Sequence, residues 1–145
     1  LGPGIGYNFS ASDDLGRIIA LDVPADAVAG EVTIHYIPGY PSGTPISTDI
    51  LFFGDYAFTF LPEPKNAELL MPITLGVDYG DDVTSALQSV SQGDESRLLL
   101  YWWNGEGWQD AATTCVTPAA YERLPEINRL RVPVCQLGTF LLVAP

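Results

Sequence analysis

The sequence predicts an all-β protein, an immunoglobulin-like antiparallel β-sandwich of about 8–10 strands with at most one short helix. Short apolar runs recur along the chain, and clusters of Gly, Pro, Asn and Asp separate them at near-regular intervals. The 14 Gly and 12 Pro leave little room for long helices. The 145 residues suit one domain, so we expect a single unit over residues 1–145 that begins with a flexible leader, residues 1–6.

Five strands are expected in the first part of the chain, bounded by residues that favour turns. They are residues 7–12, 17–23, 31–37, 49–53 and 56–61, with a turn at 13–16 between the first two. In the third strand, Val32, Ile34 and Tyr36 share one face because side chains alternate along a strand. Pro24 has no N–H to donate, so the second strand ends before it.

Residues 69–79 alternate most clearly between apolar and polar positions. Pro72 within this run predicts an edge strand or a bulge, because proline cannot donate a ladder hydrogen bond. Residues 82–90 are the one helical candidate, with Asp81 or Asp82 as its N-cap.

The last third predicts two hairpins and a disulfide. Residues 97–103 and 108–113 flank Asn104-Gly105-Glu106-Gly107, a turn sequence that tolerates positive φ. Residues 129–134 and 139–143 are the closing strands, and we expect a second hairpin that pairs 108–115 with 130–135. Cys115 and Cys135 stand at the feet of that hairpin, which favours a disulfide over two unrelated buried thiols. No CxxC pair exists and His35 is the single histidine, so the cysteines do not form a zinc motif.

The charge excludes some partners. A net charge of −12 with six Lys and Arg provides no basic footprint for nucleic acid or for an anionic membrane surface. The apolar runs are too short to span a bilayer as helices. The sequence starts at Leu1 without a signal segment, so an excised domain and a processed chain both remain open.

Several motifs in fixed order carry a family resemblance. Leu100–Cys115 reads LYWWNGEGWQDAATTC, Tyr121–Phe140 reads YERLPEINRLRVPVCQLGTF, and Leu21–Val28 reads LDVPADAV. The pattern resembles a β-sandwich module of secreted and cell-surface proteins of environmental bacteria, which has a YYW(D/N)G..W.DA hairpin and a V..CHLS.FAL closing strand. It is similar, more distantly, to the β-sandwich domain of ankyrins and netrin receptors, some of which cleave themselves.

The resemblance implies an extracellular β-sandwich over most of the chain. Gln136 and Gly138 stand where the bacterial family often has His and Ser, so a nucleophile and a base for self-cleavage are missing.

Candidate sites for chemistry or ligands are few, and no cofactor is expected. His35 has no serine-elbow motif to act with, and we interpret it as a surface residue. Asp78, Asp81 and Asp82 are weak calcium candidates, without EF-hand spacing. Tyr101, Trp102, Trp103 and Trp108 are candidates for a sugar platform, although alternation places at least one Trp in the core.

We therefore expect a non-catalytic structural module, secreted or at the cell surface, and not an enzyme. Its partners would be copies of itself or neighbouring surface domains, and it would form a filament if the leader supplied a strand to the next copy. Ile5, Tyr7 and Phe9 are the candidate assembly strand, and the alternative is that they begin the first strand of their own domain. The second function is an adhesion module that binds a glycan or Ca²⁺.

Overall fold

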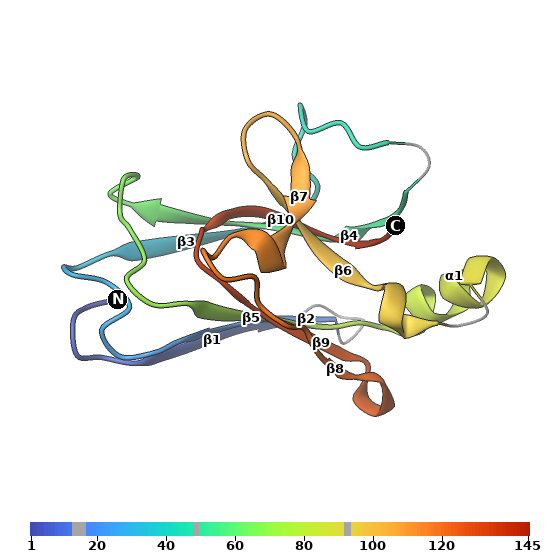
Figure 1. The fold of residues 1–145 in the computed structure, drawn as a ribbon, viewed down its shortest axis with the longest axis horizontal. Coiled ribbons are helices and arrows are strands. Elements are labelled where there is room, and N and C mark those ends of the chain that lie inside the picture. The colour runs from blue at the N-terminus through green and yellow to red at the C-terminus, as the bar shows by residue number, and fades with distance from the viewer. Residues whose placement is uncertain (13–16, 48–49, 92–93) are drawn as a thin grey trace.

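A computed structural model describes residues 1–12, 17–47, 50–91 and 94–145 as two facing five-stranded antiparallel sheets (Figure 1). The first sheet has the order β1-β2-β5-β9-β8, and the second has the order β3-β4-β10-β6-β7. The predicted all-β sandwich is thus confirmed, and the residues described form ten strands and one short α-helix. The expected turn at 13–16 and the first residue of the expected strand 49–53 lie outside the described residues.

The bounds of the elements are as follows. The first sheet contains β1 (Tyr7–Ser12), β2 (Ile18–Val23), β5 (Ile73–Asp78), β8 (Glu122–Leu124) and β9 (Arg129–Val134). The second contains β3 (Thr33–Pro38), β4 (Leu51–Glu63), β6 (Leu99–Trp103), β7 (Trp108–Asp110) and β10 (Gly138–Ala144). The helix α1 covers Asp81–Ser91, and the 3-10 turns η1, η2 and η3 cover Glu95–Arg97, Ala111–Thr113 and Pro125–Ile127.

The core lies between the sheets and is built on aromatic side chains from β4 and β10. Phe58 stacks on Phe140 with ring centroids 5.6 Å apart, and Phe60 meets Phe58 edge-on at 5.7 Å. Ile73, Leu75 and Val77 of β5 face them from the other sheet and are completely buried. The alternation of β5 explains this, because every second side chain points inward.

The central strand β10 is buried on both faces. Phe140 and Leu142 join the main core, whereas Leu141 and Val143 point to the outer face of the second sheet. Ile46 and Ile50, which come between β3 and β4 in the chain, pack against this outer apolar cluster. A strand covered on both sides reads as a continuous apolar run, which is what residues 140–144 show.

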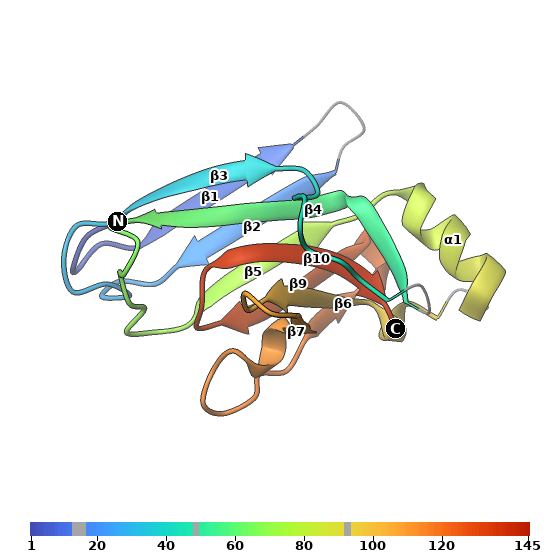
Figure 2. The same cartoon turned by 90° about the horizontal axis from the view of Figure 1, so that it is seen from above.

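One end of the sandwich is closed by α1 (Figure 2). Val83 and Leu87, four residues apart on one helix face, are completely buried in the main core. The expected N-cap is wrong by a residue or two, because Asp81 and Asp82 already lie in the first helical turn. Carboxylates there still interact favourably with the helix N-terminus.

Two expectations about strands differ from the structure. Pro72 precedes β5, which is a central strand between β2 and β9, so residues 69–79 are not an edge strand. The two expected strands 49–53 and 56–61 form one long strand, β4, with a register shift opposite Leu141 and Leu142. A bulge absorbs the extra residues without ending the strand.

The second expected hairpin is wrong, because its arms belong to different sheets. β7 pairs with β6 in the second sheet, whereas β9 pairs with β5 and β8 in the first. Asp110 ends β7 after three residues, since its side chain accepts a hydrogen bond from the Ala112 N–H and caps η2. The chain then crosses to the first sheet, where β8 and β9 form the actual hairpin.

The disulfide between Cys115 and Cys135 is present although that hairpin is not. Cys115 follows η2 on the crossing into the first sheet, and Cys135 follows β9 at the return crossing. Thr114 holds the two segments together, because its hydroxyl accepts from the Cys135 N–H at 3.0 Å. The bond therefore joins two crossings between sheets.

The expected flexible leader is anchored at two points. The Leu1 nitrogen donates to the Val32 carbonyl at 2.6 Å, and the Val32 N–H donates to the Leu1 carbonyl at 2.9 Å. Gly4 N–H also donates to the Asp26 carboxylate at 2.6 Å.

No helix in the described ranges is both long and apolar enough to cross a membrane.

Truncation of Phe140 to Ala tests the core. Phe140 is completely buried, so we expect Phe140→Ala to lower the free energy of unfolding by about 3–5 kcal/mol, the usual effect of a cavity at a large core aromatic. Urea unfolding followed by tryptophan fluorescence measures the change. The control is Val116→Ala at a fully exposed position, which should lower the free energy of unfolding by no more than about 0.5 kcal/mol. An equally small loss in Phe140→Ala would contradict the burial of Phe140.

Replacement of both cysteines by Ala tests the cross-link. The bond closes a loop with a sequence separation of 20. Loss of this restraint on the unfolded chain should lower stability by roughly 3 kcal/mol. Thermal unfolding of the double variant measures it, and two titratable thiols in the denatured, unreduced wild type would refute the bond.

Candidate functional site

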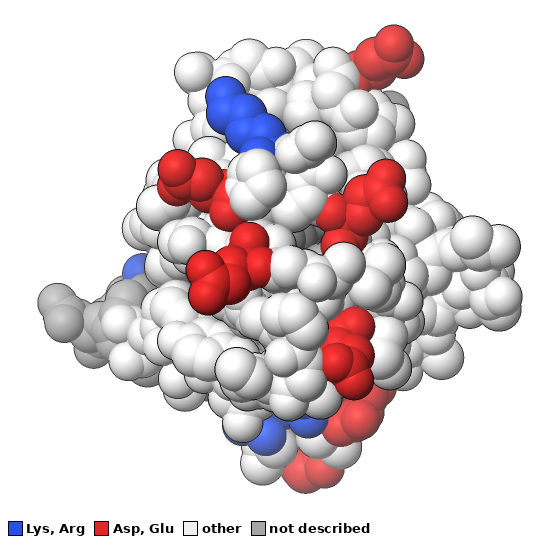
Figure 3. All heavy atoms as spheres, turned by 90° about the vertical axis from the view of Figure 1, so that its left-hand side faces the viewer, with Lys and Arg blue, Asp and Glu red and all other residues white. Residues whose placement is uncertain are grey.

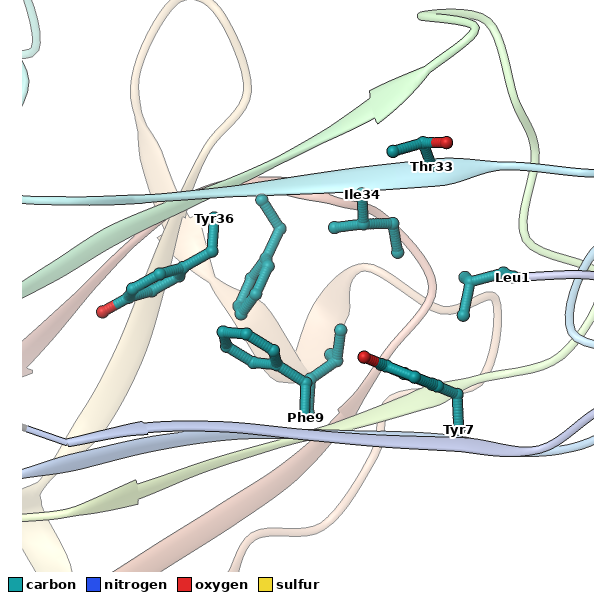
Figure 4. A pocket seen from close by; sticks show the side chains of 8 residues that line it. Leu1, Tyr7, Phe9, Thr33, Ile34 and Tyr36 are labelled. Carbon is teal, nitrogen blue, oxygen red and sulfur yellow. The ribbon is translucent and has the colours of Figure 1, made fainter.

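An apolar hollow lies between an edge strand of the first sheet and an edge strand of the second. We call it the β1–β3 seam, and its volume is about 340 Å³. β1 and β3 are the outer strands on this side, and Figure 4 shows Tyr7 and Phe9 rising from β1 toward Ile34 and Tyr36 of β3. Its lining residues are Leu1, Tyr7, Phe9, Leu21, Thr33, Ile34, Tyr36 and Phe60.

Three aromatic rings form the floor of the seam and tie the two sheets together. Phe9 of β1 lies 5.3 Å from Tyr36 of β3 and 5.9 Å from Phe60 of β4, measured between ring centroids, and Tyr36 lies 5.4 Å from Phe60. Each ring tilts or turns its edge toward its neighbours, the arrangement that the aromatic quadrupole favours. The floor is thus apolar, and Tyr7, 53% exposed, forms the rim.

A second hollow of about 200 Å³ continues the seam beyond Tyr36. Arg17 borders it, forms an ion pair with Asp55 at 3.0 Å and places its guanidinium 5.6 Å from the centre of the Tyr56 ring. The Tyr56 hydroxyl donates to Asp82 at 3.0 Å and accepts from the Gly80 N–H at 2.7 Å. This end of the seam is therefore polar and charged, in contrast to the aromatic floor.

The pKa of Tyr56 is raised to about 12, chiefly by burial; the hydrogen bond from the Gly80 N–H opposes this shift and the neighbouring Asp82 carboxylate adds to it. Burial also raises the pKa of Tyr79, which donates to Glu95, and that of Tyr121, which donates to Asp110. In all three cases a tyrosinate would be poorly solvated beside a carboxylate. These tyrosines are structural donors in the neutral form.

The candidate assembly strand begins the seam. Tyr7 and Phe9 lie on β1, which pairs with β2 of the same chain from Tyr7↔Val23 to Ser12↔Ile18. The structure thus has the intramolecular alternative, in which these residues begin the first strand of their own domain. Ile5 precedes the strand and is 61% exposed. The tyrosine and the isoleucine therefore supply the exposed apolar surface beside the seam.

Two of the three calcium candidates bind other side chains, and the third lies in the first turn of α1. Asp78 receives two hydrogen bonds from Arg129, at 2.7 and 2.9 Å, and Asp82 accepts from Tyr56. Asp81 lies in the first turn of α1. Within residues 1–12, 17–47, 50–91 and 94–145, no three His, Cys, Asp or Glu side chains gather as a metal site would require.

The tryptophans of the hairpin are partly buried in three different contacts. Trp102 packs against the main core and donates its indole N–H to the Leu137 carbonyl at 3.1 Å. Trp108 packs on the outer cluster and donates to the Thr44 carbonyl at 3.3 Å, with Trp103 5.3 Å away in an edge contact. The four aromatic side chains therefore do not form one flat platform for a sugar.

Two other positions singled out in the sequence have structural roles. His35 is exposed on the outer face of β3, where its Nε2 lies 2.8 Å from the Glu63 carboxylate. Gly138 has φ +139°, and a Cβ there would lie 3.0 Å from the Trp102 indole nitrogen. Glycine at 138 is thus required by the close approach of Trp102.

Carboxylates dominate the electrostatics of the surface. Red Asp and Glu side chains spread over the end of the sandwich that Figure 3 presents. Arg129 and Arg131 are engaged by Asp78 and Asp22, and Arg123 by the carbonyls of Glu95 and Leu98. These three arginines therefore serve internal contacts, and carboxylates outnumber basic groups in the chain.

No protein-family model matches this chain, and no curated protein matches it.

Part of the site could be found in the sequence. Phe9 was a candidate there, but its partner Tyr36 was assigned only to a strand face. The period-2 pattern shows which side chains of a strand share a face, but it does not say that β1 and β3 lie on the same side of the sandwich.

Alkaline titration tests the tyrosine contacts. Because the pKa of Tyr56 is raised in the folded state, its contribution is fully present below about pH 10, the unfolded value, and is lost as pH rises toward about 12. Stability should therefore fall over this range, and Tyr56→Phe should reduce the slope. Urea unfolding at each pH measures it. The control is Tyr7→Phe at the exposed rim, and an unchanged slope in Tyr56→Phe would contradict the assignment.

Proposed function

We propose that this protein is a non-catalytic structural module of the cell exterior, which acts by binding another polypeptide along the β1–β3 seam. The observation that carries the proposal is the seam itself: an aromatic-floored groove bordered on both sides by the edge strands of the sandwich. Such an edge presents unpaired backbone N–H and C=O groups to an incoming strand, and a neighbouring apolar groove takes its alternate side chains.

The disulfide supports an extracellular place for the module, because such bonds persist in oxidising compartments. The acidic exterior supports solubility and disfavours nucleic acid and anionic lipid. The resemblance to surface modules of bacteria points the same way. Self-assembly into a surface layer or filament belongs to this proposal, with the seam as one of its contacts.

Glycan binding is the second candidate, and the aromatic lining of the seam favours it. Tyr7 at the rim and the rings of Phe9 and Tyr36 form a concave apolar surface with hydroxyl groups at its edge, as sugar sites have. A glycan array with Tyr7→Ala as the matched variant tests it. Binding lost in that variant would replace polypeptide by glycan as the ligand of the seam.

Surface labelling of intact cells that produce the protein tests the extracellular proposal. We expect a membrane-impermeant biotin reagent to label Lys65, which is exposed, without permeabilisation. The bond between Cys115 and Cys135 should be intact in protein trapped with an alkylating agent at lysis. A cytoplasmic enzyme of the same cells is the control for leakage. Labelling only after permeabilisation, together with free thiols, would contradict the proposal.

A further inference from the structure

We propose that the partner at the seam is a second copy of this chain, with the two β1 strands paired antiparallel across a two-fold axis. The inference rests on the proposed function, because it names the polypeptide that the seam binds. The first sheets of two molecules would then continue into each other.

β1 differs from the other three sheet edges in its lack of protection. β8 and β7 have three residues each, and β8 carries Glu122 and Arg123. β3 ends in Pro38 and carries His35 against Glu63. β1 has six residues, YNFSAS, without charge or proline, and its register with β2 is unbroken. Natural edges use charge, proline, bulges or short length to prevent pairing, and β1 has none of these.

The free side of β1 is also accessible within the described part of the chain. β1 ends the order of the first sheet, so its only strand partner there is β2. Tyr7, Asn8, Ser10 and Ser12 are exposed, and Phe9 and Ala11 are half-buried. An added strand would therefore meet backbone groups directly and would not have to displace another element.

The alternation of β1 selects a register for pairing with itself. Residues opposite each other in an antiparallel pair share a face, so inward Tyr7, Phe9 and Ala11 must meet inward residues of the second copy. An axis through Phe9 places the two Phe9 residues opposite each other, Tyr7 opposite Ala11, and Asn8 opposite Ser10. The large Tyr7 then has a small partner in the other copy, and the outer face pairs uncharged polar residues.

Charge favours this edge over other contacts between copies. At −12 per molecule, two copies repel over most of their surfaces. β1 has no ionisable group except the Tyr7 hydroxyl, so its approach sets no carboxylates opposite one another. In the pair, the inward side chains of the second β1 extend the aromatic floor of Phe9, Tyr36 and Phe60 and cover the Tyr7 rim.

Such a contact is isologous and closes as a dimer, so a filament would need a different second contact.

Sedimentation velocity of the full chain over a range of concentrations tests the dimer. We expect reversible dimerisation of the wild type. Asn8→Lys combined with Ser10→Lys sets two like-charged pairs across the axis and should weaken the dimer about tenfold or more. Asn8→Lys combined with Ser10→Glu sets opposite charges across the same axis and should restore it. Circular dichroism and thermal unfolding confirm that each variant is folded.

The matched control places the same two charges on the other long edge, as His35→Lys combined with Ile37→Lys on the outer face of β3, at positions that do not line the seam. It should leave the dimer intact. A wild-type monomer at every concentration, dissociation by the β3 variant alone, or no rescue by the Ser10→Glu combination would each overturn the β1 pairing. A monomer that is still labelled on intact cells overturns only the dimer, whereas a dimer confined to the cytoplasm overturns only the extracellular proposal.

Discussion

The stack of Phe58 on Phe140, with Phe60 beside it, is the contact on which the rest of the molecule depends. β4 and β10 lie side by side in the second sheet, so their inward rings present one continuous apolar surface to β5. Burial of that surface fixes the spacing of the sheets and brings η2 beside the end of β9, where the disulfide forms. It also places β1 and β3 on the two sides of the seam, because each is the edge strand of its sheet on the same side of the sandwich.

The two sides of the sandwich are closed by different means. On the side of β7 and β8 the chain crosses through η2, and the disulfide reinforces the crossing. On the side of β1 and β3 the gap is filled by Phe9, Ile34 and Tyr36, with Leu1 bound to Val32 at one end. Side chains can accommodate an added strand, whereas a covalent crossing cannot. The proposed contact between molecules follows from this asymmetry.

Several carboxylates of the acidic surface have structural partners. Asp78, Asp82, Glu95 and Asp110 each accept from an arginine or a tyrosine, and the tyrosines involved are held neutral by burial. Asp94 caps η1 through Ser96, which holds the pKa of its carboxyl below the usual value. These carboxylates stabilise turns and strand ends, a structural use that agrees with a module acting through shape.

The sequence by itself determined the fold class, most strand positions, the hairpin at Asn104 and the disulfide, because alternation, turn residues and cysteine count are local properties. It also placed Tyr36 on one strand face with Val32 and Ile34, and Phe9 in the candidate assembly strand with Ile5 and Tyr7. Only the tertiary structure decided that β7 and β9 lie in different sheets, that β5 is central and that β1 and β3 border one groove. The reason is that a strand's pattern shows which side chains turn inward but not which strand will lie beside it. That choice is made by the packing of both sheets at once.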